Sequence, residues 1–139
     1  MNAWGAMKSI RKVLDHSHCL PGRPRADRGL QSGRSAPKFL SMAKLGKIAV
    51  MQEGSDVTIA AIGTQVNFAV EAAKILSGEG VNAEVLNVHT LKPLDRDALV
   101  ASAKKTGRVL TTEQHQVNGG LGGAVAEVLA EEYPTPMKI

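Results

Sequence analysis

The chain has 139 residues, the length of one ordinary domain, and 43% of them are apolar while only 3% are aromatic. The formal net charge of +4 is uneven, because residues 1–46 hold nine basic and two acidic residues while residues 47–139 hold eight basic and eleven acidic ones. A single cysteine excludes an internal disulfide framework, and the lack of a run of about 20 apolar residues argues against a membrane-spanning segment.

Residues 1–45 are predicted to be a disordered or poorly packed basic tail. The stretch from Leu20 to Lys38 is rich in Pro, Gly, Arg and Ser, a composition that buries too little apolar surface to offset its chain entropy. We therefore place a domain boundary near residues 44–46, with one folded domain from residue 46 to residue 139.

The basic tail has to be considered for metal binding, for nucleic-acid binding and for cellular targeting. Cys19 has two histidines within three residues, but a closed zinc site needs four well-spaced ligands, so no metal site is expected there. Basic residues without interleaved aromatics predict no specific nucleic-acid binding. With no secretory signal and no spanning segment, we expect a cytoplasmic protein without a membrane partner, and the Arg-rich tail leaves organellar targeting as the less favoured alternative.

The first two predicted strands are residues 47–51 and 57–62, joined by a turn that contains Gly54. Two strands with such a turn predict a hairpin. The second run is apolar at nearly every position, which is typical of a central strand covered on both faces.

The next predicted elements alternate between helix and strand. A helix is expected from Asn67 to Gly78, followed by a buried strand at residues 83–88. The helix after that is predicted at residues 96–105, with Asp95 as its N-cap and Gly107 as its end.

The last predicted elements are a strand at residues 108–112, a helix from about Ala124 to before Pro134, and a strand barely begun at residues 137–139. Strands and helices that alternate in this way predict an α/β fold with three layers and a mostly parallel sheet. Because the last strand is so short, we expect the domain to be truncated at its C-terminal end.

A cluster of glycines at residues 119–123 lies between the third parallel strand and the last helix. Glycines before a helix let backbone N–H groups approach an anion, so a phosphate cradle is one hypothesis. The dinucleotide spacing G-x-G-x-x-G/A fails, because Val125 stands where the third glycine is needed after Gly120 and Gly122. We favour a tight strand-to-helix turn, with nucleotide binding as the alternative.

Glu113 and His115 follow the same strand, at the carboxyl edge where open α/β sheets place their functional groups. An acid/base pair is conceivable there, but no Ser or Cys stands in a nucleophile elbow. His89, at the end of the previous strand, is interpreted as a loop-edge histidine with satisfied hydrogen bonds. We assign no catalytic, cofactor-binding or metal-binding residue, and we predict that a loop or interface is formed by Glu113, His115, Asn118, Gly119, Gly120 and Gly122.

Five segments in register resemble the C-terminal domain of transketolases. They are residues 46–47 (GK), 53–58 (EGSDVT), 91–95 (LKPLD), 112–115 (TEQH) and 119–127 (GGLGGAVAE). The histidine at position 115 resembles the transketolase pattern, particularly that of the split two-subunit forms, more than the pattern of the beta subunits of 2-oxoacid dehydrogenases. Deoxyxylulose-phosphate synthase is the nearest alternative family.

The resemblance implies a domain of an enzyme that transfers a two-carbon ketol unit between sugar phosphates of the pentose phosphate pathway, with thiamin diphosphate and Mg²⁺ as cofactors. It implies that this domain serves assembly or dimerisation, binds no cofactor itself and is inactive alone. The expected partners are the cofactor-binding domains or subunit of the transketolase, in a homo- or hetero-oligomer. The rival hypothesis is a free-standing anion- or nucleotide-binding module.

Overall fold

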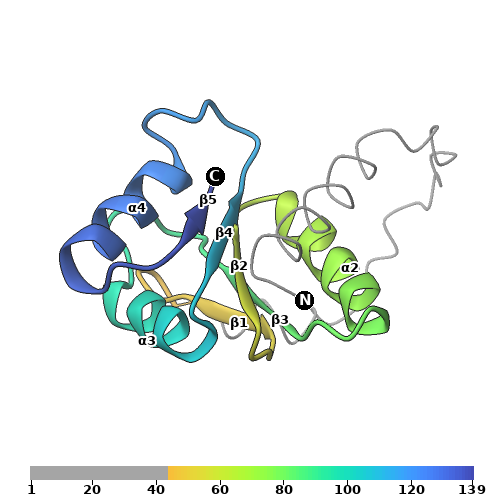
Figure 1. Ribbon diagram of the computed structural model, residues 1–139. Helices are drawn as coiled ribbons and strands as arrows, with labels where there is room; N and C mark the ends of the chain where they lie inside the picture. Colours follow the sequence, from red (N-terminus) through yellow and green to blue (C-terminus); the bar gives the residue numbers. More distant parts are fainter. Residues whose placement is uncertain (1–43) are drawn as a thin grey trace, which may run out of the picture.

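The computed structural model describes residues 44–139, so the expectations for the basic tail and for Cys19 lie outside the described residues. Its centre is a five-stranded sheet in the order β1-β3-β2-β4-β5 (Figure 1). The strands are β1 (Ala49–Gln52), β2 (Val57–Ala61), β3 (Ala83–Asn87), β4 (Val109–Thr112) and β5 (Met137–Lys138). Strands β2 to β5 run parallel to one another, and β1 pairs with β3 in the antiparallel direction.

Three helices complete the layers: α2 (Gln65–Gly78), α3 (Arg96–Thr106) and α4 (Leu121–Glu132). Helix α2 covers one face of the sheet, while α3 and α4 cover the other (Figure 1). Strand β2 is buried at all five positions, because its side chains point alternately toward the two helical layers. The predicted α/β class, the mostly parallel sheet and the central place of this strand are confirmed.

The predicted hairpin between the first two strands is wrong, because β1 pairs with β3 and not with β2. The turn between β1 and β2 crosses over the start of β3. A β-carbon on Gly54 would lie 2.2 Å from the backbone of Ala83 and Glu84, so only glycine allows this crossing without displacement. The backbone N–H groups of Ser55 and Asp56 both donate to the Asn82 carbonyl oxygen, at 3.0 and 2.9 Å, which holds the turn in place.

The helix boundaries agree with the sequence at α3 and differ at the other two helices. The Asp95 side chain accepts a hydrogen bond from the Ala98 N–H, and Gly107 ends the helix with a φ of 69°. Helix α2 begins at Gln65 instead of Asn67, and α4 begins at Leu121, so part of the glycine cluster is helical. Within residues 44–139, no helix combines the length and apolar character needed to cross a bilayer.

Candidate functional site

The sheet changes direction of winding between β2 and β4, which are neighbours. The chain leaves β2 toward α2 on one face and leaves β4 toward α4 on the other face (Figure 1). In open α/β sheets the crevice at such a switch point, outside the carboxyl ends of the strands, is the usual place for a binding site. A cavity of about 430 Å³ lies there, lined by residues 62–64, Leu91, 113–115 and 119–120.

The Glu113 carboxylate binds the first backbone amides of α4. One oxygen accepts from the Leu121 N–H at 2.8 Å and the other from the Gly122 N–H at 2.9 Å. Gly120 is the N-cap and has no side chain to satisfy these donors, so Glu113 replaces a capping side chain and places a negative charge at the positive end of the helix. The glycine cluster therefore does hold an anion, and that anion belongs to the protein itself.

Three positions of the cluster require glycine for different structural reasons. A positive φ, of 84°, occurs at Gly119, whereas Gly120 has a φ of −96°. At Gly120 the constraint is space, because a β-carbon there would lie 2.2 Å from the nearer Glu113 carboxylate oxygen. At Gly122 a β-carbon would lie 2.5 Å from the Ile139 side chain. The glycines pack closely where the chain enters α4, as favoured from the sequence, but the connection from β4 is a loop of eight residues, 113–120.

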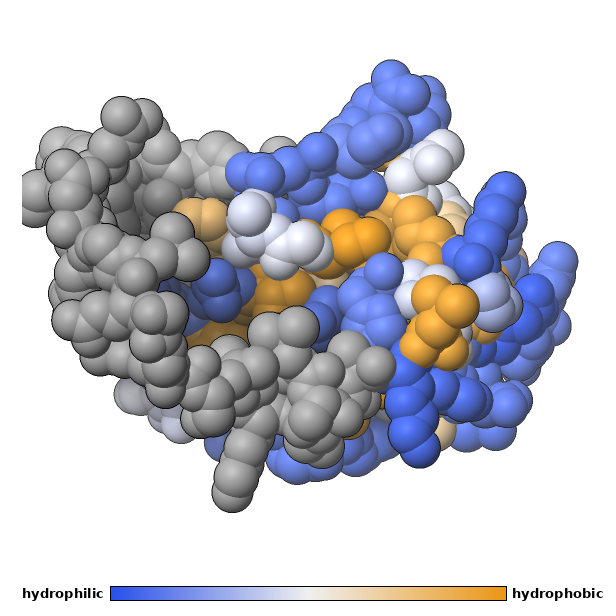
Figure 2. Space-filling view, turned by 180° about the vertical axis from the view of Figure 1, so that it is seen from behind, coloured by the Kyte–Doolittle hydropathy of each residue, from blue (hydrophilic) through white to orange (hydrophobic). Residues whose placement is uncertain are grey.

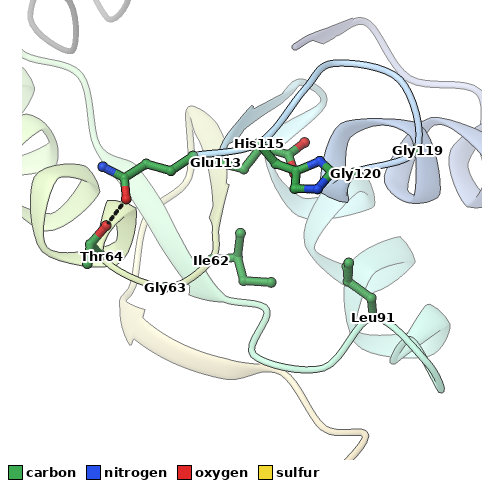
Figure 3. A pocket seen from close by; sticks show the side chains of 9 residues that line it. Ile62, Gly63, Thr64, Leu91, Glu113, His115, Gly119 and Gly120 are labelled. Carbon is green, nitrogen blue, oxygen red and sulfur yellow. Dashed lines mark hydrogen bonds between the residues drawn. The ribbon is translucent and has the colours of Figure 1, made fainter.

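His115 and Asn118 are exposed on the loop between β4 and α4. The His115 Nδ1 atom lies 3.3 Å from the Gln116 carbonyl oxygen, while the Glu113 carboxylate is bonded to the α4 backbone, so these two residues form no hydrogen-bonded acid/base pair. Figure 3 shows Ile62 and Leu91 across the cavity from Glu113, His115 and Gly120. The role of the loop in an interface stays a prediction.

The interpretation of His89 as a histidine with satisfied hydrogen bonds is wrong for one of its two ring nitrogens. Its Nδ1 atom lies 2.9 Å from the Thr90 hydroxyl oxygen, but its buried Nε2 atom has no hydrogen-bond partner among the described residues. This residue is not among those that line the cavity.

A second polar cluster, which the sequence reasoning missed, lies at the opposite, amino end of the parallel strands. Glu84 is 2% exposed in β3, and its carboxylate accepts hydrogen bonds from Ser102 and Lys105 on α3 and from Thr58 on β2. The Lys105 ammonium also binds Glu53 at 2.8 Å. The signal available in the sequence was a polar Thr58 and a charged Glu84 within two mostly apolar strands, whereas their pairing follows only from the structure.

A protein-family model described as "Transketolase, C-terminal domain" matches residues 46–138. The 6-deoxy-6-sulfo-D-fructose transketolase subunit SqwH of Clostridium sp. (strain MSTE9) is 53% identical over 94 residues, which are 68% of this chain and 29% of that protein. A 1-deoxy-D-xylulose-5-phosphate synthase of Heliobacterium modesticaldum is 41% identical over 123 residues, 88% of this chain and 19% of that one.

Among solved structures, a split gene transketolase described as an inactive beta4 tetramer superposes with a TM-score of 0.67 at 54% identity, covering 68% of this chain and 31% of that one. The chain thus spans less than a third of the length of each of these proteins. The synthase alignment is longer than the stretch from residue 46 to residue 139, so it includes residues upstream of 46.

Proposed function

Because this chain belongs to the transketolase C-terminal domain family, we propose that residues 46–139 form a docking domain that helps to assemble a transketolase-type enzyme. The complete enzyme would transfer two-carbon ketol units between sugar phosphates with thiamin diphosphate. That chemistry takes place in other domains or in a partner subunit.

The observation that carries this proposal is the match of residues 46–138 to the transketolase C-terminal domain, and the contact between Glu113 and α4 adds an argument against direct cofactor binding. A diphosphate at this edge of the sheet would need the amides of Leu121 and Gly122, and these amides are already bonded to the Glu113 carboxylate. The amides of Leu121 and Gly122 are therefore not free for a diphosphate, which supports cofactor binding in other domains or in a partner subunit. The same contact argues against the rival hypothesis of a nucleotide-binding module.

A chimera tests the docking role. Residues 46–139 would replace the matching 94 residues of the SqwH subunit, which are 53% identical. We expect the chimera to reach the oligomeric mass of intact SqwH in light scattering, whereas SqwH with that region deleted should not. If the deleted protein assembles as well as the intact one, the domain has no docking role.

The equivalent domain of a deoxyxylulose-phosphate synthase is the second candidate. The observation in its favour is that the alignment with the Heliobacterium enzyme covers 88% of this chain and passes upstream of residue 46. Residues 46–139 can also replace the matching region of that synthase. The two candidates are then separated by which chimera, the one with SqwH or the one with the synthase, recovers more of the assembly of its intact parent.

A further inference from the structure

The cavity between β2 and β4 has features of a binding site that the docking role leaves unassigned. Its volume of about 430 Å³ lies within the range of small-ligand pockets. Ile62 and Leu91 are each half-buried and form an apolar wall on the side opposite Glu113 (Figure 3). Figure 2 shows hydrophobic surface beneath a hydrophilic ridge that, from its place in Figure 1, is the connection between β4 and α4.

The charge at this cavity selects against anions. Glu113 and His115 are its ionisable lining residues, and no described Lys or Arg lines it. Each Glu113 oxygen accepts one backbone hydrogen bond, which leaves further acceptor capacity on the carboxylate. A phosphate or carboxylate ligand would meet this fixed negative charge without a cation to pair with, whereas a cationic group would be attracted.

A second acceptor lies at the mouth of the cavity. The Gln114 side-chain oxygen accepts from the Thr64 hydroxyl at 2.7 Å, the bond drawn as a dashed line in Figure 3, and this oxygen also has a further lone pair. Two acceptors above an apolar wall suit an amphipathic side chain that carries several N–H donors in a fixed plane. Arginine has that form, since its stem packs on apolar groups while its guanidinium binds more than one acceptor.

We propose, on the basis of the docking function above, that this cavity receives an arginine side chain of a partner subunit. The guanidinium binds Glu113 and Gln114, and the aliphatic stem lies against Ile62 and Leu91. The cavity is then the specific contact of the docking surface.

The first test titrates the full 139-residue chain with N-acetyl-arginine amide and follows the methyl NMR signals of Ile62 and Leu91. We expect saturable shifts, with affinity at least fivefold higher than for N-acetyl-norleucine amide and without competition from butyl phosphate. Glu113→Gln and the exposed Gln114→Ala should each weaken arginine binding at least threefold. Glu71→Gln, an exposed carboxylate on α2, is the matched control and should leave it unchanged. Equal binding of the norleucine probe, or tighter binding of butyl phosphate, overturns the proposal.

The second test separates a partner's arginine from a free ligand. Leu91→Arg in the SqwH chimera would fill the cavity with a cation of its own, and we expect it to reduce assembly at least fivefold, while Glu71→Gln does not. If the chimera assembles normally with Leu91→Arg, the arginine contact is wrong although the docking domain stands. If the chimera without this substitution fails to assemble, the docking function itself is wrong.

Discussion

At the scale of single residues, Gly120 and Glu113 share one contact. An alanine at position 120 would place its β-carbon 2.2 Å from the Glu113 carboxylate and push it away from the α4 amides. We expect Gly120→Ala to lower the free energy of unfolding by about 1–2 kcal/mol, the size of a lost helix cap. Glu113→Ala should cost a similar amount. Because both changes break the same cap, the double variant should cost much less than their sum in urea unfolding.

Two neighbouring variants serve as controls for this cycle. Gly122→Ala should be milder than Gly120→Ala, because the nearest side chain is that of Ile139, which is 46% exposed and can turn aside, and the Thr111 hydroxyl at 3.2 Å has to shift only slightly. His115→Gln should stay within about 0.5 kcal/mol, since the ring is exposed. Fully additive effects of Gly120→Ala and Glu113→Ala would show that the carboxylate does not act as the cap.

The sequence predicted which residues meet at this site but not how they meet. A carboxylate after a strand and glycines before a helix placed Glu113 and Gly120 at one edge of the sheet. The hydrogen bonds to Leu121 and Gly122 depend on a loop conformation between them, which periodicity does not encode. The space required at Gly120 follows from that loop and was therefore out of reach of the sequence.

At the scale of elements, Asp95 joins the start of α3 to the segment before β1. It is 8% exposed, and its carboxylate accepts from the Ile48 N–H at 3.1 Å as well as from Ala98. Burial raises the pKa of Asp95, but the hydrogen bonds from Ile48, Ala98 and Lys47 together outweigh it, so its pKa lies below the ordinary value of 3.8. The ionised side chain therefore stabilises the folded state above about pH 4, and this contribution is lost as the pH falls through the lowered pKa.

We expect Asp95→Ala to lower the free energy of unfolding at pH 7 by about 1–2 kcal/mol. The difference from the unmodified chain should shrink below pH 4, in urea unfolding measured from pH 7 to pH 2.5. Asp97→Asn, in the same helical turn but exposed, is the control and should have a smaller effect. A difference that stays constant down to pH 2.5 would contradict the assigned role of the charge.

The buried cluster at the other end of the sheet gives the opposite dependence on pH. Hydrogen bonds to Glu53 and then to Glu84 raise the pKa of Lys105 above its ordinary 10.5, although burial acts in the other direction. The ammonium thus stabilises the fold fully below pH 10.5, and this contribution is lost as the pH rises through the raised pKa.

Lys105→Met leaves the Glu84 carboxylate buried without its cation. We expect a loss of about 1–3 kcal/mol in urea unfolding at pH 8, and the loss should diminish at pH 11. Adding Glu84→Gln to Lys105→Met should recover part of it, because the buried charge is then gone. Lys74→Met, on the exposed side of α2, is the control. If Glu84→Gln makes the Lys105→Met variant still less stable, the buried charge is not the cause.

Elements whose signals are local were predicted well. Asp95 and Gly107 bound α3 through contacts within a few residues, and both were read from the sequence. The partner of β1 was not, because the deciding contact brings Gly54 against the backbone of Ala83 and Glu84, far along the chain. The polar cluster was missed for the same reason, since Lys105 reaches Glu84 only after α3 has packed on the sheet.

At the scale of the whole molecule, the alternation of strands and helices predicted the parallel sheet but not the strand order. That order places β2 beside β4 and so creates the switch point and its cavity. Strand order depends on which crossovers share a face, and this is decided by packing between distant elements.

For the whole molecule, we predict that the isolated chain has no transketolase activity. With thiamin diphosphate, Mg²⁺ and sugar phosphates, the purified 139-residue chain should show no ketol transfer, because under the docking-domain proposal the cofactor binds to other domains or to a partner subunit. The measurement is product formation by chromatography, with an intact transketolase as the positive control. Sustained turnover by a chain verified by mass spectrometry would refute the docking-domain proposal.

Because β1 and β2 pair with strands that come later in the chain, this domain cannot complete its sheet early during synthesis on the ribosome. Both strands emerge before β3, yet β3 is the partner of β1 and a partner of β2, whose other neighbour, β4, comes later still. The apolar segment Val57–Ala61 thus has no strand to pair with until Asn87 has left the exit tunnel. While the part of the nascent chain outside the tunnel ends between Ala61 and Asn87, it exposes an unpaired hydrophobic strand, and we expect a chaperone to protect this domain most at that stage of synthesis.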